Sequence, residues 1–318
     1  MKKSIPIISL ILLGCVSLFI GVHSIPFQDI LDLSEKQQLV LWSTRVPRTI
    51  SLIVVGAISS VCGLIMQHLT QNKFVAPTTA GTMDSARVGM LVVMLFLPNA
   101  SIFMKSGVAF IFAFVGTMLF IQLTKYLPAN NQLMIPLVGV MFGNIIGSFV
   151  TFFAYQFQLV QNMTSWLQGN FSMVVRGDYE LIYATLPVLI ICYLFAYRFT
   201  LVGMGEDMAT SIGLNYQRTQ RLGLLLVSLA SSLVLVTIGS LPFLGVIVPN
   251  IVSYYFGDQI KNTLWITAVS GSIFLVICDI LSRILIQPYE VPVSLIVGII
   301  GSVVFIVLLL RGQRYAIK

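Results

Sequence analysis

The adjacent acids Glu206 and Asp207 have the residue types and the setting to bind a partner protein. They lie in a polar stretch, LVGMGEDMATSIGLNYQRTQR, which separates two long apolar regions. Glycines before the acids allow a sharp turn, residues 206–212 predict a two-turn helix, and Gly213 is a typical helix stop. Acids are stabilised at the positive N-terminal end of a helix. We expect residues 203–216 to form a surface against which a soluble partner pushes.

Three arginines form a second candidate binding set. Arg45 and Arg48 stand three positions apart around Pro47, where an apolar run begins. At a helix start this spacing puts both guanidinium groups on one side, and we expect them outside the membrane, available to an acidic partner. The alternative is that they anchor the helix end at the headgroups. Arg283 lies four residues after Asp279, so a mutual ion pair competes with any docking role.

Catalytic and metal-binding chemistry has no matching residue set in this sequence. The four cysteines lie far apart within apolar runs, which favours small buried side chains over a metal site or a disulfide framework. His23 and His68 have no neighbouring carboxylate or cysteine cluster. The chain also lacks a G-x-x-x-x-G-K-[ST] loop for ATP. We therefore expect no catalytic residue, no metal site, no bound cofactor and no enzyme activity.

Long apolar runs carry these residues. Of the 318 residues, 57% are hydrophobic and 9% charged, which is typical of an all-α polytopic membrane protein. The runs do not alternate, which excludes a β-barrel. We expect one transmembrane domain, residues 1–318, with about ten helices. The expected spans are 5–23, 47–68, 77–97, 107–125, 134–157, 181–199, 219–240, 244–256, 263–282 and 292–311.

The placement of basic residues predicts the topology. With Lys2 and Lys3 inside, the loops on their side hold more Lys and Arg than the opposite loops, which favours two cytoplasmic termini. The Glu206 stretch is then cytoplasmic. The net charge is +7, and the basic residues concentrate in alternate loops, as expected for a protein that spans a membrane. The lipid bilayer is therefore the expected partner, and nucleic acid is not. Residues 24–46 are expected to hold an amphipathic helix at the outer surface.

Four motifs carry a resemblance to a known family. They are RVPRT at 45–49, GEDMATSIGL at 205–214, GSLPFLGVIVPNIV at 239–252 and DILSRILIQPYEVPVSLIVGIIG at 279–301. In this order and at these spacings, the chain resembles the FecCD-type permeases of bacterial iron-siderophore, haem and cobalamin ABC importers, which are type II importers. The resemblance runs from about Arg45 to Arg311.

The resemblance implies roles for individual residues. Arg45, Arg48 and Arg283 match the arginines that receive acidic side chains of the substrate-binding protein. The segment that couples the permease to its ATPase matches Gly205, Glu206, Asp207, Ala209, Thr210, Ser211 and Gly213. The cytoplasmic gate matches Asn72, Phe74, Asn130 and Asn131.

The family architecture implies the remaining partners. A cobalamin-permease-like fold of ten helices works as a dimer, with the pathway between the subunits and lined by spans five and ten. The second subunit is an identical copy or a related permease. Two ATP-binding cassette subunits hold ATP and Mg²⁺, and an extracytoplasmic binding protein, a lipoprotein in many systems, delivers the ferric chelate.

Span five contains Gly139, Gly143 and Gly147, a GxxxGxxxG pattern that lets another helix approach closely. A contact within the bundle and a dimer seam or pathway lining are both compatible with this pattern. The chain also departs from the family pattern: Asn72-Lys73-Phe74 replaces Asn-Pro-Leu, Asn250 replaces a histidine and Ser253 replaces an arginine. The gate is therefore expected to have a different shape.

Asp84 and Arg87 lie one turn apart inside span three, where the family has small neutral residues. Charges within a membrane are costly and face a cavity or each other. One interpretation is a mutual structural pair. The other is that Arg87 faces the pathway and attracts an anionic ferric chelate.

The sequence thus predicts the permease subunit of an importer of a ferric siderophore in the bacterial cytoplasmic membrane. Haem or cobalamin is the alternative cargo within the same family. An ion-coupled secondary transporter is a rival from another class, although only Asp84 and Arg87 could serve as its ionisable residues at mid-membrane. An intramembrane enzyme would need a nucleophile with a base, or a metal cluster.

Overall fold

The computed structural model describes residues 4–21, 34–124, 126, 134–177 and 179–316, and these contain helices and turns but no strand of a sheet. The two β-bridges found there are isolated, between Gln168 and Ser240 and between Ile286 and Tyr289. This confirms the all-α prediction. The helices are α1 (Ser4–Phe19), α2 (Glu35–Val40), η2 (Leu41–Arg45), α3 (Val46–Leu69), α4 (Thr82–Phe96), α5 (Ile102–Thr124), α6 (Met134–Gln156), α7 (Val160–Leu167), η3 (Glu180–Ala184), α8 (Thr185–Leu194), α9 (Ala196–Val202), α10 (Glu206–Ser211), α11 (Tyr216–Thr237), α12 (Leu244–Phe256), α13 (Ile260–Ile284) and α14 (Val293–Ala316).

Several of these helices have the length and composition of membrane spans. Among the described residues, five segments qualify, namely 35–69, 102–124, 134–156, 216–237 and 260–284. The segment 180–202 qualifies as a sixth span, bent by 63° between α8 and α9. Shorter apolar helices lie in α1, α12 and α14. The chain is therefore a multi-pass membrane protein, and the count of about ten spans stays a prediction.

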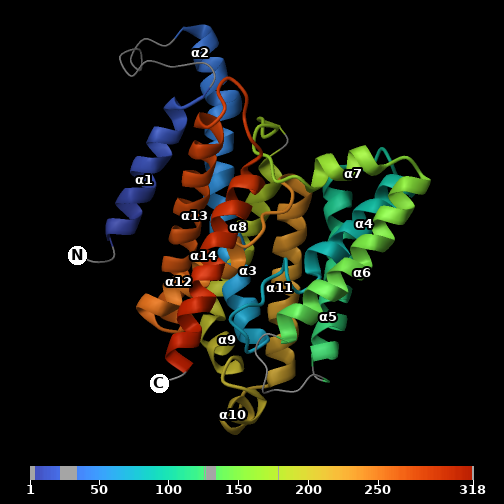
Figure 1. The fold of residues 1–318 in the computed structure, drawn as a ribbon, viewed down its shortest axis with the longest axis vertical. Helices are drawn as coiled ribbons and strands as arrows, with labels where there is room; N and C mark the ends of the chain where they lie inside the picture. Colours follow the sequence, from blue (N-terminus) through green and yellow to red (C-terminus); the bar gives the residue numbers. More distant parts are fainter. Residues whose placement is uncertain (1–3, 22–33, 125, 127–133, 178, 317–318) are drawn as a thin grey trace.

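Helix α3 forms the centre of the bundle and packs against α13, α12 and α11 (Figure 1). Its side chains Leu52, Val55 and Ile65 are fully buried. Glycine makes the closest approach possible: a Cβ atom on Gly63 would lie 1.9 Å from the carbonyl oxygen of Gly245 on α12. Small residues at such crossings let two backbones touch, which fixes the position of α3.

The helix that carries the N-terminal arginines begins earlier than expected. The π-helical turn η2 joins α2 to α3, so residues 35–69 form one helical segment. Ser34 and Gln37 form a capping box at its start, where the Ser34 backbone N–H donates to Gln37 Oε1 at 2.9 Å. The predicted start at residue 47 is wrong because this cap initiates a helix in a polar sequence. The expected surface helix of 24–46 lies partly outside the described residues.

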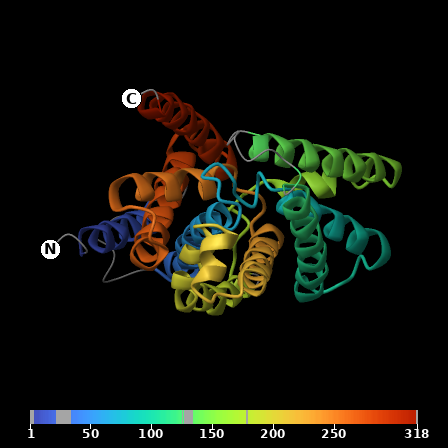
Figure 2. The same cartoon turned by 90° about the horizontal axis from the view of Figure 1, so that it is seen from below.

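The segment between α3 and α4, residues 70–81, is called the gate loop below. Gly81 adopts a φ of 68° directly before α4, so α4 starts at Thr82 and not at the predicted residue 77. Seen from the α10 end, α6 and α14 stand on the same side of the molecule with the gate loop between them (Figure 2). The gate loop is therefore placed to touch both helices.

Candidate functional site

The expected coupling segment protrudes from one end of the bundle as α10, opposite the end that carries α2 and α7 (Figure 1). Gly205 precedes α10 with a φ of 104°, and Gly213 follows it with a φ of 82°, conformations that favour glycine. Glu206 and Asp207 lie exposed in the first turn, while Ala209 is buried against the bundle. The predicted short helix with acids at its N-terminus is confirmed.

An apolar ridge on the same segment was missed from the sequence. Met204, Met208 and Ile212 each expose more than half of their surface, and we call them the α10 ridge. Met208 and Ile212 stand four residues apart, on one side of the helical turn, whereas Met204 precedes Gly205 at the start of α10. The sequence contains this spacing, but the long apolar runs on both sides of the segment make three more apolar residues inconspicuous. The segment therefore presents an apolar ridge beside two acids.

At the opposite end, the arginines expected to lie outside the membrane are buried within the protein. Arg48 donates from Nε and Nη2 to Asp279 Oδ1 at 2.9 and 2.7 Å, and from Nη1 to Glu290 Oε2 at 2.7 Å. Asp279 is fully buried. Arg45 and Arg48 are buried because they lie inside the continuous helix 35–69 and other parts of the chain cover them, and their docking role stays a prediction.

The other two arginines hold α1 against the bundle. Arg283 Nη1 donates to the carbonyl oxygens of Ser17 and Ile20 at 2.9 and 2.6 Å, and Arg45 Nη1 donates to that of Leu18 at 2.6 Å. These carbonyls belong to the last turn of α1 and the residue after it, where intrahelical partners run out. Arg283 also pairs with Asp279, as its spacing predicted. Buried arginines thus cap the C-terminus of α1.

Glu290 completes this outer arginine cluster, which we define as Arg45, Arg48, Arg283, Asp279 and Glu290. Its Oε2 also accepts a hydrogen bond of 2.6 Å from Ser172 Oγ. Partial burial acts to raise the pKa of Glu290, but the hydrogen bond from Ser172 and the charge of Arg48 outweigh it and lower that pKa. A pocket of about 150 Å³ opens between the arginines and Glu290. Apart from its place in the motif at 279–301, nothing in the sequence marks this glutamate as a partner of the arginines.

Of the two gate residues predicted in the gate loop, Phe74 contacts α14. Asn72 Oδ1 accepts a hydrogen bond of 2.9 Å from the Phe74 N–H, which shapes the turn. The Phe74 ring packs edge-on against Phe305 of α14 with 5.8 Å between centroids, and Phe305 also contacts Phe243. The other predicted gate residues, Asn130 and Asn131, lie outside the described residues.

Three positions that depart from the family pattern contact one another. Lys73 Nζ lies 2.9 and 3.0 Å from the carboxylate oxygens of Asp258 and 3.2 Å from Ser253 Oγ. Asn250 Nδ2 donates to the Lys73 carbonyl oxygen at 2.7 Å. These bonds tie the gate loop to α12 and to the turn before α13.

Asp258 is the acid at the centre of this contact. Partial burial acts to raise its pKa, but hydrogen bonds from Ser253 and Lys73 and the charge of Lys73 lower that pKa below its ordinary value. The contact therefore stays ionised at neutral pH.

Asp84 and Arg87 form the expected ion pair, with Arg87 Nη1 2.8 Å from Asp84 Oδ1. They line an open groove of about 700 Å³ between α4 and α6, called the α4–α6 groove. The three glycines of α6 do not all make the same kind of contact: two pack within the bundle, and one borders open space. Gly139 faces the gate loop and Gly143 faces Asp84, both within the chain, whereas a Cβ on Gly147 would meet open space at the groove.

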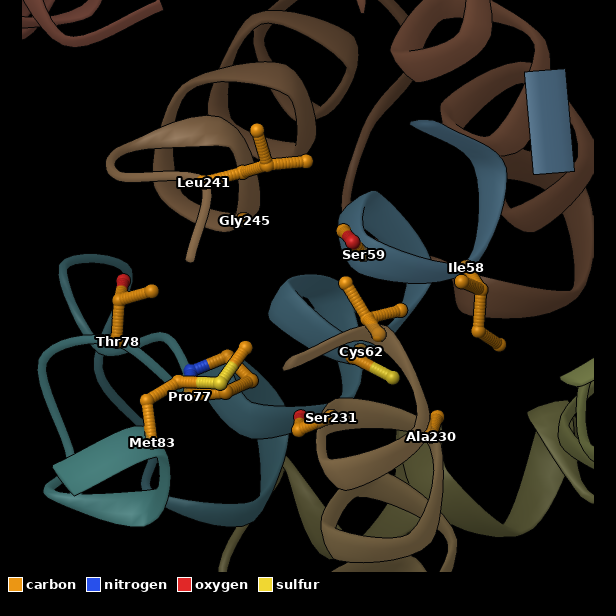
Figure 3. Close-up of a pocket in the computed structure, with 11 residues that line it drawn as sticks. Ile58, Ser59, Cys62, Pro77, Thr78, Met83, Ala230, Ser231, Leu241 and Gly245 are labelled. Atoms are coloured by element: carbon orange, nitrogen blue, oxygen red, sulfur yellow. The ribbon is translucent and has the colours of Figure 1, made fainter. Parts of the chain in front are cut away.

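A third, much smaller cavity lies inside the bundle, where α3, α4 and α11 meet the gate loop (Figure 3). Its volume of about 20 Å³ is close to the space that one water molecule occupies. It is lined by apolar groups and by Ser59, Thr78 and Ser231. This cavity cannot hold a substrate. Among the described residues, no group of three or more His, Cys, Asp or Glu side chains is arranged to bind a metal ion.

Comparisons with known proteins agree over nearly the whole chain. A model of the FecCD transport family matches residues 9–311. The petrobactin import system permease protein YclN of Bacillus subtilis is 50% identical over 99% of this chain and 100% of its own length. The ferric-anguibactin transport system permease protein FatD of Vibrio anguillarum is 38% identical over 97% of this chain and 98% of its own. A solved structure described as a metal-chelate type ABC transporter in an inward-facing conformation has a TM-score of 0.81, with 21% identity and coverage of 96% and 97% of the two chains.

Proposed function

Because this chain belongs to the FecCD transport family, we propose that it is the transmembrane permease subunit of a bacterial ABC importer for a ferric siderophore. The similar permeases named for petrobactin import and ferric-anguibactin transport favour a siderophore over haem or cobalamin as the cargo. The chain is a transport component and not an enzyme. Its place is the cytoplasmic membrane, with both termini and α10 on the cytoplasmic side.

Helix α10 is the observation that carries this proposal. It offers two acids and the α10 ridge to a partner, and it adjoins the end of α3 and the gate loop. A Cβ atom on Gly203 would lie 2.6 Å from the His68 ring, and one on Gly205 would lie 3.7 Å from Gln71 Nε2. A partner ATPase that moves α10 therefore acts directly on the segment that leads to the gate. ATP and Mg²⁺ belong to that ATPase.

The outer arginine cluster is the proposed docking site of the substrate-binding protein. Its arginines already hold two carboxylates of this chain, and of these Glu290 is the more accessible. A carboxylate of the binding protein that enters the adjacent pocket replaces Glu290 on Arg48, and Asp279 stays in place. Docking then becomes an exchange of acidic partners and needs no exposed arginine in the free permease.

Two permease subunits, identical or related, form the proposed pathway between them. Helices α6 and α14 lie on one side of the chain with the gate loop between them, which suits a path bordered by both (Figure 2). Phe74, packed against Phe305, is the proposed cytoplasmic closure, together with Asn72. Asn130 and Asn131, in the sequence between α5 and α6, remain proposed gate residues.

Association with the ATPase tests this function. The doubly substituted variant Glu206→Lys/Asp207→Lys is expected to lose co-purification with the ATPase, because it reverses the charge of the α10 surface. Glu35→Lys is the matched control, since Glu35 is an exposed acid at the first turn of α2, at the opposite end. Normal co-purification of the α10 variant would overturn the proposal.

A further inference from the structure

The α4–α6 groove brings charge to the middle of an apolar helix. Asp84 packs against Gly143, so that a Cβ at that glycine would lie 2.5 Å from Asp84 Oδ2, and both lie near the midpoint of α6. Ionised side chains at such a depth are costly in hydrocarbon and face water or protein instead. The groove is therefore a polar surface of the transport machinery and not a surface for lipid.

Polar side chains alternate with Val150 and Phe152 along the α6 wall of the groove. Asn144, Ser148, Thr151 and Tyr155 follow one another at helical spacing, and all four are exposed and border the groove. The Ser148 and Thr151 hydroxyls donate to carbonyls one turn back, at 2.8 Å. Such bonds let hydroxyls sit in an apolar setting. An exposed asparagine amide beside an ion pair gains no comparable protection, which favours water on this face.

Arg87 offers hydrogen-bond donors that Asp84 does not use. A guanidinium group carries five N–H donors, and the contact with Asp84 occupies Nη1. Among the described residues Arg87 Nη2 makes no hydrogen bond, so it is the donor open to a ligand, whereas the unpaired Nε is buried. A planar guanidinium with free donors suits the paired oxygens of a carboxylate or a catecholate. The groove volume of about 700 Å³ lies within the range of small-molecule sites, roughly 300–1,000 Å³.

We propose that the α4–α6 groove is an anion-binding wall of the translocation path, where Arg87 hydrogen-bonds the oxygens of an anionic ferric chelate. The inference rests on the proposed import function and names a contact for its cargo. The polar face of α6 replaces part of the water around the chelate. Asp84 orients the guanidinium and keeps the pair neutral, so that the chelate is held weakly enough to leave again.

Thiol labelling tests whether the groove holds water. In a Cys15→Ser background, which removes the exposed native cysteine, Ser148→Cys and Ile145→Cys are compared in assembled importers in nanodiscs with a water-soluble maleimide. Ile145 is the matched control, because it is exposed on an adjacent apolar face of α6. We expect Ser148→Cys to react about tenfold faster or more, since only a hydrated thiol ionises to the reactive thiolate. Equal rates would overturn the proposal.

Uptake of ferric petrobactin tests the contact itself. The neutral double variant Asp84→Asn/Arg87→Gln leaves no unpaired charge, and it is expected to keep its thermal midpoint while kcat/KM falls roughly 10- to 100-fold, the loss of one charge-assisted hydrogen bond. Arg87→Lys, which keeps the charge, is expected to lose less. Wild-type uptake by the double variant would show that the pair is only structural. Failure of the wild type to take up any ferric siderophore with ATP would instead remove the proposed function.

Discussion

Arg48 donates two hydrogen bonds to Asp279, from Nε at 2.9 Å and from Nη2 at 2.7 Å, although the two residues are 231 positions apart in the sequence. The pair joins α3 to α13 inside the bundle, toward the end that carries α2. Removing one partner of such a pair leaves the other charge buried without compensation, which is far more costly than never having formed the pair.

Asp279→Asn is therefore expected to destabilise the permease by about 3–5 kcal/mol. The reason is that Arg48 and Arg283 both lose their buried counter-charge. Thermal unfolding in detergent, monitored by tryptophan fluorescence, measures the change. Asp258→Asn is the control, because that acid is more than half exposed. A loss of less than about 1 kcal/mol, the value of a surface pair, would contradict the buried network.

Glu290→Gln is expected to strengthen binding of the substrate-binding protein several-fold. The change frees a charged donor of Arg48 in the outer arginine cluster, so that the incoming carboxylate has no internal rival. Surface plasmon resonance with the permease in nanodiscs measures the Kd. Weaker or unchanged binding would remove the exchange of acidic partners from the docking proposal.

Met208→Ser is expected to weaken association with the ATPase by about 1–2 kcal/mol, the range of an apolar contact at an interface. Met208 lies in the middle of the α10 ridge, and more than half of its surface is exposed. Met173→Ser is the control, since Met173 is even more exposed than Met208 but lies at the other end of the bundle. Equal affinity of the two variants for the ATPase would exclude the ridge from the interface.

Lys73→Gln is expected to change the free energy of unfolding by less than about 1 kcal/mol, because its ion pair with Asp258 is exposed. The gate loop should nevertheless exchange its backbone hydrogens faster, since it loses its tie to the turn before α13. Hydrogen exchange with mass spectrometry measures this on peptides that cover residues 70–81. Unaltered exchange there would show that the contact does not restrain the gate loop.

The same ion pair predicts a pH dependence. The pKa of Asp258 lies below its ordinary value, so its stabilising contribution is present at neutral pH and is lost only as the pH falls through that lowered pKa. Gate-loop exchange, corrected for the intrinsic rate, should therefore stay constant from pH 7 down to about pH 4, the ordinary range of an aspartate. A rise in exchange above that pH would mean that the pair is not what holds the loop.

Local chemistry was predictable from the sequence, and long-range pairing was not. Glycines on both sides of Glu206 and Asp207 specified α10, and the spacing of Asp279 and Arg283 specified their pair, because each depends on neighbours within a turn or two. Arg48 and Asp279 meet only because α3 packs on α13, and no short pattern encodes that contact. The meeting of Lys73 and Asp258 has the same origin.

The predicted helix limits were wrong where the polarity of the sequence does not follow the helices of the structure. The polar residues EKQQ led to the prediction of an outer surface segment that includes residues 35–46. In the structure the helix starts after the cap at Ser34 and continues through the π-helix η2 into α3. The bend between α8 and α9 lies in an apolar sequence without glycine or proline at the break, so hydropathy shows one continuous run there. Arg87 and Asp84 were recognised as a pair, but their groove depends on where α6 lies.

Reconstituted transport tests the central claim most directly. Proteoliposomes that contain the permease, its ATPase and its binding protein should take up ferric petrobactin only when ATP is supplied to the side that carries α10, and not when the ATPase is left out. Uptake by the permease without the ATPase, or stimulation by ATP only from the face opposite α10, would contradict the account.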